Sequence, residues 1–329
     1  MTAPGLLQLR WRPYRFVLPR RLITSRGALV QRRGWLLRLE APDGHLGWGE
    51  AAAPLLAASD ADLAAAVAAM PAAIDRGALE QMLPQLPSAL ACGLGMALAE
   101  LEGLGSQGQG GWRSAPPAAW LLPAGDAAVS ALEQVLSDCS IDPAHPLTLK
   151  WKVAAVSDAQ ERALLDVLLQ RLPPAAKLRL DANGGWDRLT ADEWVDRLSE
   201  EPRLEWLEQP LAPHDLQGLA ALAQRLPVAL DESLPYLSEQ QRSAWPGWLV
   251  RRPLQEGDPR PLLRELEAGA PRQMLSTAFE TGIGRRCLEH LAALQADGPT
   301  PAAPGLAPGW SPGGDLFASD PQRAWEAAA

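Results

Sequence analysis

Two lysines and three acidic residues recur through the middle of the chain at regular intervals. Lys150 and Lys152 lie in the segment LTLKWKVA, in which polar and apolar residues alternate. Asp181 ends the run KLRLD, Glu208 ends LEWLE and Asp231 ends VALD. Beginning at Lys152, the steps are 29, 27 and 23 residues, and each has room for one strand, one helix and two short loops. The spacing therefore predicts that these residues lie on successive strands of one parallel sheet.

The chemistry that suits these residue types is removal of a proton beside a carboxylate. Alternation is the period of a strand, so Lys150 and Lys152 are expected on one face and the apolar residues on the other. A single acid at a strand end can instead cap the following helix. Three acids in step with a lysine pair favour a site for a hard divalent cation, most simply Mg²⁺. We predict Asp181, Glu208 and Asp231 as the metal ligands.

Lys152 is the predicted base. An ordinary lysine has a pKa of about 10.4 and stays protonated at neutral pH. Lys150 on the same strand face and a nearby dication would both disfavour the charge on Lys152, which predicts a lowered pKa. Asn183, two residues beyond Asp181, is expected to support the water shell of the metal. The four histidines are isolated from one another, so no zinc site is predicted.

Strand-like and helical runs alternate from Ala118 onward, a pattern typical of a parallel sheet closed as a barrel. The glycine-rich segment GSQGQGGWRSAPP precedes this alternation and marks a domain boundary. We predict an α/β fold with three parts: an α+β domain over residues 1–112, a (β/α)₈-type barrel over residues 113–296, and a C-terminal segment over residues 297–329. The C-terminal segment is rich in proline and glycine and is not expected to be a barrel element.

The first 50 residues have the pattern of strands, and the turn Pro42-Asp43-Gly44 predicts a hairpin. An arginine-rich segment, PRRLITSRGALVQRRG, lies between the first strands and is predicted to be a solvated loop. The following region is rich in alanine and leucine and is expected to be helical. Gly93 and Gly95 do not make a dinucleotide fingerprint, because no β-rich strand precedes them and no third glycine follows in register. They are better explained by close helix packing.

Composition excludes several classes of protein. The chain has 329 residues and a formal net charge of -9, which argues against a nucleic-acid-binding surface. No run of about 18 apolar residues could span a bilayer, and the N-terminus lacks the apolar core of a signal peptide. Cys92, Cys139 and Cys287 are far apart, so a disulfide framework is not expected. We predict a cytoplasmic enzyme with a small-molecule carboxylate substrate and no nucleic-acid or membrane partner. The sequence predicts no particular oligomeric state.

Taken together, the motifs resemble the enolase superfamily, and within it most closely the o-succinylbenzoate synthase family. The resemblance extends over nearly the whole chain, and an early GHLGWGEAA looks like the strand of the family's capping domain. Each motif alone is weak, whereas their order and spacing are specific. The motifs are Lys-Trp-Lys at 150–152, Leu-Asp-Ala-Asn at 180–183, Trp-Leu-Glu-Gln-Pro at 206–210, Asp-Glu-Ser at 231–233 and the late segment LSTAFETGIG.

The resemblance implies a modified (β/α)₈-type barrel with an N-terminal α+β capping domain, against which the C-terminal segment packs. It implies Mg²⁺-dependent syn-dehydration of 2-succinyl-6-hydroxy-2,4-cyclohexadiene-1-carboxylate to 2-succinylbenzoate, a step toward menaquinone or phylloquinone. The arginine-rich loop would then fold over the barrel mouth, where Arg26 is the candidate to meet a carboxylate. Arg179, Ser276 and Thr277 are carried over as substrate contacts, with an internal ion pair as the alternative for Arg179. Glu280 is expected to brace the strand ends.

One position departs from the family. The strand after Asp231 usually carries a lysine just before a proline, and here Arg252 precedes Pro253. Arginine stays protonated, so Arg252 cannot be a base, although it can act as a fixed cation beside the substrate. Racemisation or epimerisation needs a base on each face of the substrate, whereas syn elimination needs only Lys152. The substitution therefore favours elimination over an N-acylamino acid racemase or dipeptide epimerase. A degenerate, non-catalytic barrel is a further alternative, disfavoured by the intact lysines and acids.

Overall fold

The computed structural model describes residues 5–57, 59–138 and 146–328. Two sheets organise them: an antiparallel sheet built by the N-terminal residues and a parallel sheet built by the middle of the chain. No helix in the described ranges is long and apolar enough to cross a membrane. Cys92 and Cys287 are buried free thiols, whereas Cys139 and His145 lie outside the described residues.

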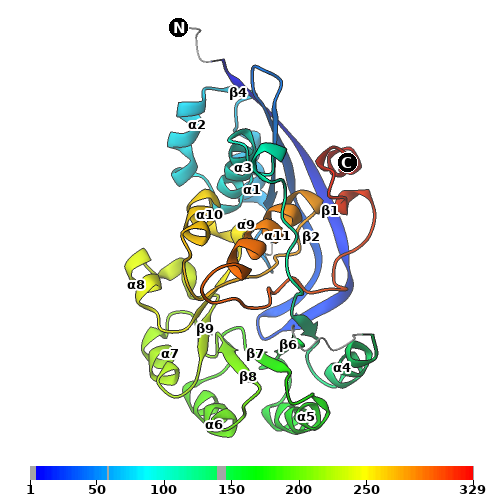
Figure 1. The fold of residues 1–329 in the computed structure, drawn as a ribbon, viewed down its shortest axis with the longest axis vertical. Coiled ribbons are helices and arrows are strands. Elements are labelled where there is room, and N and C mark those ends of the chain that lie inside the picture. The colour runs from blue at the N-terminus through cyan, green and yellow to red at the C-terminus, as the bar shows by residue number, and fades with distance from the viewer. Residues whose placement is uncertain (1–4, 58, 139–145, 329) are drawn as a thin grey trace.

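Residues 7–101 form a capping layer in which three helices cover a four-stranded sheet (Figure 1). The sheet order is β3-β2-β1-β4, and its apolar face packs on the helices around Leu37, Leu39 and Leu94. The predicted hairpin at Pro42-Asp43-Gly44 is confirmed, because β2 and β3 pair antiparallel across it. The elements are β1 (Leu7–Thr24), β2 (Gly27–Glu40), β3 (Leu46–Ala52), α1 (Ala61–Ala68), β4 (Ala73–Ile74), α2 (Arg76–Met82), η1 (Leu83–Gln85), α3 (Ser88–Leu101) and η2 (Gln107–Gln109).

The parallel sheet has seven strands in the order β11-β10-β9-β8-β7-β6-β5, and helices α4 to α8 follow its outer side (Figure 1). Leu149 and Trp151 of β6 face those helices, so the lysines between them point to the inner face, as predicted. The elements are β5 (Trp120–Leu122), α4 (Ala127–Asp138), β6 (Thr148–Lys152), α5 (Asp158–Arg171), β7 (Lys177–Asp181), α6 (Arg188–Leu198), β8 (Leu204–Glu208), α7 (Leu216–Ala223), β9 (Val228–Leu230), η3 (Leu234–Tyr236), α8 (Glu239–Ala244), β10 (Trp248–Arg251), α9 (Pro253–Glu256), α10 (Arg260–Glu267), β11 (Gln273–Leu275), α11 (Gly282–Ala296), η4 (Asp315–Phe317) and α12 (Pro321–Ala327).

The parallel sheet curls but does not close by pairing of its two edge strands, β5 and β11, in the described part of the chain. The C-terminal segment lies between these edges. Gly305 pairs with Ser276 just after β11, and the N–H of Ala119, next to β5, donates to Pro304 O at 2.9 Å. As expected, no strand of the parallel sheet lies in residues 297–328, but Pro304 and Gly305 make backbone contacts with both edges. Pro304 and Gly305 can connect the two edges because Pro304 contacts the backbone beside β5 and Gly305 contacts the backbone beside β11.

The arginine-rich segment between the first strands is not a loop. β1 and β2 extend through it as one long hairpin whose turn is at Ser25 and Arg26, here called the hairpin tip. A register shift between Val17 and Leu22 interrupts the pairing, which explains why the sequence alternation fades there. In Figure 1 the hairpin runs from the capping layer down to the strands around β6.

Besides the hairpin, a second set of residues joins the capping layer to the rest of the molecule. It consists of Glu50, Glu80, Gly95 and Glu100 and is here called the cap base. Glu50 is fully buried and accepts hydrogen bonds from Tyr14, Thr281 and Gly284. Glu80 pairs with Arg260 at 2.6 Å between Oε2 and Nη2, and Glu100 pairs with Arg286.

The two glycines of α3 allow close approach in two directions. A Cβ on Gly95 would lie 2.9 Å from Cδ of Pro259, on the side of the parallel sheet, as the packing interpretation expects. A Cβ on Gly93 would instead lie 3.0 Å from the backbone of Glu50 in β3. Close packing of α3 therefore serves the capping layer as well as its contact with the rest of the molecule.

Candidate active site

The inner face of the parallel sheet gathers the predicted lysines and acids at the carboxyl ends of its strands. Lys152 is in register with Asp181, and Asp181 is in register with Glu208. Lys152 Nζ lies 2.5 Å from Asp181 Oδ2. Lys150 Nζ lies 2.7 Å from the same oxygen and 2.5 Å from Glu208 Oε1. All four side chains are almost fully buried. A charged cluster of this kind is sustained only by mutual pairing.

The electrostatics of the cluster differ from one carboxylate to the next. Burial raises the pKa of Glu208 to about 8, and the neighbouring Asp181 carboxylate adds to the shift. Burial also opposes ionisation of Asp181, but Lys150 and Lys152 outweigh it and hold its pKa well below the usual range. For Lys150, burial acts to lower the pKa, and the carboxylates of Asp181 and Glu208 reverse this and raise it. Two lysines therefore face two carboxylates in this cluster, and the lysines favour ionisation of Asp181 while burial opposes that of Glu208.

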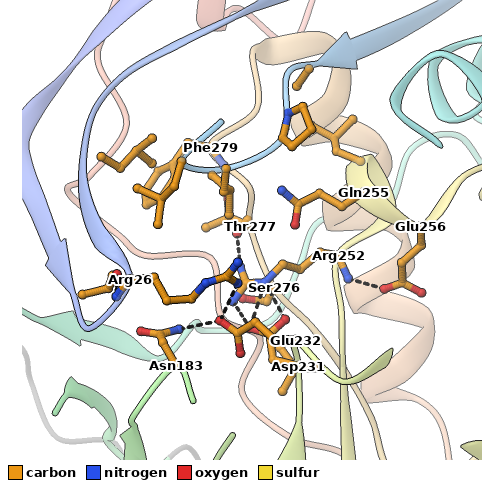
Figure 2. Close-up of a pocket in the computed structure, with 18 of the residues that line it drawn as sticks. Arg26, Asn183, Asp231, Glu232, Arg252, Gln255, Glu256, Ser276, Thr277 and Phe279 are labelled. Carbon is orange, nitrogen blue, oxygen red and sulfur yellow. Dashed lines mark hydrogen bonds and ion pairs between the residues drawn. The ribbon is translucent and has the colours of Figure 1, made fainter. Parts of the chain in front are cut away.

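Arg252 follows β10 and enters the same site. Its Nε lies 3.0 Å from each oxygen of Asp231, and its Nη2 lies 2.6 Å from Asp231 Oδ2. Its Nη1 also donates to the carbonyl of Thr277 at 2.5 Å, as Figure 2 shows. Arg251 does not line the cavity and pairs with Glu256 and Glu265. Between the two adjacent arginines, it is Arg252 that occupies the position expected from the sequence.

Glu232 is a site residue that the sequence analysis missed. Its Oε1 accepts a hydrogen bond from Asn183 Nδ2 at 3.0 Å and lies 3.6 Å from Arg26 Nη1. Asn183 Oδ1 in turn accepts from Lys152 Nζ at 2.9 Å. Burial, followed by repulsion from Asp231, raises the pKa of Glu232. Its place directly after a predicted metal ligand was the only available signal.

Ser276 and Thr277 follow β11 and line the site. The Thr277 hydroxyl donates to Glu280 and accepts from the N–H of Phe279. Ser276 Oγ donates to Gly305 O at 3.4 Å. Glu280 also accepts from the N–H of Ala278, so it braces this turn as expected. With the Thr277 hydroxyl occupied, Ser276 is the freer of the two to meet a ligand.

Arg179 does not line the cavity. It is fully buried, its Nε lies 2.5 Å from Glu205 Oε2, and its Nη1 donates to Ala303 O at 2.8 Å. Its guanidinium also lies 3.9 Å from the ring centre of Trp206. The expectation of a substrate contact is corrected to the alternative, an internal ion pair. Arg179 precedes Asp181 by two residues, so it occupies the layer of the sheet interior beneath the acids.

A cavity of about 530 Å³ lies above these groups. Its polar floor includes both lysines, and the hairpin, the capping layer and the loop after β11 supply an apolar roof that includes Leu22, Leu29 and Phe279. Arg26 reaches the cavity from the hairpin tip, although 55% of its side chain is exposed. The tip docks through Ser25, whose hydroxyl donates to Ala182 O at 2.8 Å. The family resemblance implies that the arginine-rich segment folds over the site, and its residues Leu22, Arg26 and Leu29 do line the cavity.

The donor set at the floor fits a hard dication. Asp181, Glu208 and Asp231 follow or end adjacent strands, and Glu208 Oε2 is buried without a hydrogen-bond partner. Carboxylate oxygens are the ligands that Mg²⁺ prefers. In the described part of the chain, no three acids, histidines or cysteines converge as a metal cluster, and each of these carboxylates instead contacts a lysine or arginine. Their assignment as metal ligands stays a prediction.

The chain is similar to known proteins in both sequence and structure. Residues 146–244 match the family model described as enolase C-terminal domain-like, and residues 10–101 match the model described as MenC, N-terminal domain. The o-succinylbenzoate synthase of Thermosynechococcus vestitus is 37% identical over 296 residues, which cover 87% of this chain and 88% of that protein. The sequence similarity thus extends over the capping layer and the parallel sheet.

Solved structures of related proteins have the same fold as this chain. The crystal structure of o-succinylbenzoate synthase from Thermosynechococcus elongatus BP-1, complexed with Mg in the active site, superposes with a TM-score of 0.78 at 33% identity and covers 97% of this chain and 99% of that chain. The L-Ala-D/L-Glu epimerase of Bacillus subtilis superposes with a TM-score of 0.72 at 22% identity, covering 90% of this chain and 89% of that chain. The second similarity concerns the fold alone.

Proposed function

This chain belongs to the o-succinylbenzoate synthase family of the enolase superfamily, and from that premise we propose that it dehydrates 2-succinyl-6-hydroxy-2,4-cyclohexadiene-1-carboxylate to 2-succinylbenzoate. The observation that carries the proposal is the buried floor, where Lys152 contacts Asp181 beneath the cavity. It is the arrangement needed to take a proton from a carbon beside a carboxylate. The step would serve menaquinone or phylloquinone synthesis in the cytoplasm.

In the proposed reaction Lys152 removes the proton from the ring carbon that bears the carboxylate. The electron pair left on that carbon forms the new double bond as the bond to the neighbouring hydroxyl breaks. Lys152 returns the proton to the departing hydroxyl, which leaves as water. Both events take place on one face of the ring, so one base is enough. Aromatisation makes the step strongly downhill.

Two cations of the chain have supporting roles. Lys150, held between Asp181 and Glu208, is a fixed positive charge beneath the substrate carboxylate. Arg252 presents a second fixed charge from β10, which three strands separate from β6. Asp181, Glu208 and Asp231 would hold Mg²⁺, which would supply positive charge where negative charge develops on the substrate carboxylate.

The finer architecture follows from the same premise. We take the curled sheet of residues 113–296 as a modified (β/α)₈-type barrel capped by residues 1–112. Pro304 and Gly305, from the C-terminal segment, bridge its two edges. The C-terminal segment, residues 297–329, packs on the cap. The rings of Trp325 and Trp48 lie 5.6 Å apart, and Arg12 Nη1 donates to Trp325 O at 2.9 Å.

Racemase and epimerase activities are less well supported. They need a second base on the other face of the substrate, and the residue on β10 is Arg252, fixed to Asp231 by three contacts between nitrogen and oxygen. Burial opposes the charge of Arg252, but Asp231 outweighs it and raises the guanidinium pKa above its ordinary value. A group held in that way does not accept protons.

The test follows the loss of absorbance of the cyclohexadiene substrate with purified protein. We expect rapid conversion with Mg²⁺, none with excess EDTA, and a fall in kcat of about 10³-fold or more in Lys152→Ala. Failure of a folded, Mg²⁺-loaded protein to convert the substrate would sink the assignment. Exchange of the α-proton of an N-succinylamino acid with solvent deuterium, without dehydration of the cyclohexadiene, would favour the racemase alternative instead.

A further inference from the structure

We propose that Glu232 and Asn183 are positioning residues that couple docking of the hairpin tip to the orientation of the Lys152 amine. The proposal rests on the function proposed above, because that function gives Lys152 its role as the base. The sequence pattern assigns no role to Glu232 and predicts a different one for Asn183. Through these two residues, the position of the capping layer would affect the position of Lys152.

The hairpin tip docks on the loops that follow β7 and β9. Ser25 Oγ donates to Ala182 O at 2.8 Å, and Arg26 Nη1 lies 3.6 Å from Glu232 Oε1. The approach is close, because a Cβ on Gly185 would lie 2.5 Å from the Cβ of Ser25. The tip thus lies directly against the two residues that separate it from the floor, as the positions of Arg26, Glu232 and Asn183 in Figure 2 show.

The chemistry of the neighbours fixes the direction of the Asn183 amide. Glu232 Oε1 can only accept, and it lies 3.0 Å from Asn183 Nδ2. The Lys152 ammonium can only donate, and its Nζ lies 2.9 Å from Asn183 Oδ1. Only one of the two amide orientations satisfies both neighbours. The backbone N–H of Asn183 is held as well, by Asp181 Oδ1 at 3.1 Å.

This arrangement orients the Lys152 amine. Asp181 Oδ2 at 2.5 Å and Asn183 Oδ1 at 2.9 Å occupy two of the three directions around Nζ. Lys152 lines the cavity, so the third direction is left for the substrate. Proton transfer depends on this alignment, since a misplacement of about 1 Å can slow a reaction about 100-fold.

Glu232 is the member that links the tip to the floor. The same oxygen, Oε1, meets both Arg26 and Asn183, whereas Oε2 is buried without a hydrogen-bond partner. Without the Glu232 carboxylate, Asn183 Nδ2 loses its acceptor, and only the contact with Lys152 itself is left to hold the amide in place. The reverse orientation would place an NH₂ group against the ammonium.

The experiment compares kcat and KM for four variants with Mg²⁺ and the cyclohexadiene substrate. We expect Asn183→Gly to lower kcat by about 10- to 100-fold with KM changed by less than about threefold. Glycine suits the positive φ of 48° at this position, so folding should survive. Glu232→Leu should match Asn183→Gly, whereas Glu232→Gln, which can still accept from Asn183, should recover most of kcat. Glu267→Leu, the same substitution on the exposed face of α10, is the control and should behave as the wild type.

Coupling is tested with Arg26→Met. We expect it to lower kcat about threefold in the wild type and to have no further effect on kcat in Glu232→Leu. Equal effects in both backgrounds, or a Glu232→Leu variant as fast as the wild type, would overturn the proposal and leave the proposed function intact. An inactive wild type would overturn the function instead.

A crystal structure of Glu232→Leu decides the inference without any assay. We expect the contact between Lys152 Nζ and Asn183 Oδ1 to be lost, and its retention at 2.9 Å would contradict the proposal.

Discussion

At the cap base, the fully buried carboxylate of Glu50 accepts hydrogen bonds from Tyr14, Thr281 and Gly284, and it lies at the N-terminus of α11. At the hairpin tip, the Ser25 hydroxyl donates to Ala182 O at 2.8 Å and to Asn183 O at 3.3 Å, and Arg26 is half-exposed with a carboxylate at 3.6 Å. Buried, fully bonded groups hold a fixed geometry, whereas exposed ion pairs contribute little stability. We therefore expect the cap base to set where the cap lies, and the hairpin tip to be the weaker of the two contacts.

The largest expected effect is a loss of stability on substitution in the cap base. Glu50→Leu removes the acceptor for Thr281 N, Thr281 Oγ1, Gly284 N and the Tyr14 hydroxyl, all of which are buried. We expect the free energy of unfolding in urea to fall by about 4 kcal/mol, with kcat per folded molecule nearly unchanged. A loss below about 1 kcal/mol would mean that the base is not the firmer contact.

The cap base should also make the stability of the protein depend on pH in a distinctive way. Burial raises the pKa of Glu50 from 4.5 to about 7, so the folded protein binds this proton more tightly than the unfolded chain. The stabilisation is complete below pH 4.5 and is lost as the pH rises to about 7, by on the order of 3 kcal/mol. Glu50→Gln does not titrate. The stability of the wild type minus that of Glu50→Gln should therefore fall across this window in chemical unfolding at several pH values, and parallel curves would contradict the expectation.

Two glycines offer a matched comparison of base and tip. A Cβ on Gly95 would lie 2.9 Å from Pro259 Cδ, and a Cβ on Gly185 would lie 2.5 Å from the Cβ of Ser25. We expect Gly95→Ala to lower stability by about 1–2 kcal/mol with KM unchanged. Gly185→Ala should displace the tip, raise KM about fivefold and change stability by less. Gly313→Ala, with nothing within 4 Å, is the control. The reverse assignment of effects would refute the distinction between base and tip.

The smallest effect is expected at Ser25. Ser25→Ala removes the hydroxyl that donates to Ala182 O and Asn183 O and should change the unfolding free energy by less than about 0.5 kcal/mol. We expect KM to rise about twofold, measured in the same absorbance assay. A stability loss above about 2 kcal/mol would show that the tip holds the cap as firmly as the base does.

Much of the floor could be predicted from the sequence because strands impose a period of two and βα units impose a spacing. Lys150, Lys152 and the three acids follow both rules. The structure brings the lysines, Asp181 and Glu208 into contact and places Asp231 after the adjacent strand. Arg179 obeys the same alternation, yet it lies one layer lower and pairs with Glu205. The pattern gives the face of the sheet but not the depth along the strand at which the cavity begins.

Other parts depended on contacts between residues far apart in the chain. The hairpin had no continuous alternation because of the register shift between Val17 and Leu22. Glu232 acquires its partners from the segments of Arg26 and Asn183, neither of which its own surroundings specify. Tertiary contacts of this kind leave no local pattern.

The pairing of Gly305 with Ser276, together with the bond from Ala119 to Pro304, has a consequence for how the protein is made. A ribosome releases the capping strands first and the seven parallel strands next, but the bridge between β5 and β11 cannot form until residue 305 has emerged. At a translation rate of about 5–20 residues per second, the nascent chain spends several seconds with both sheet edges unpaired. Shielding of these edges by a chaperone during synthesis would then matter more for the yield of this protein than for its final stability.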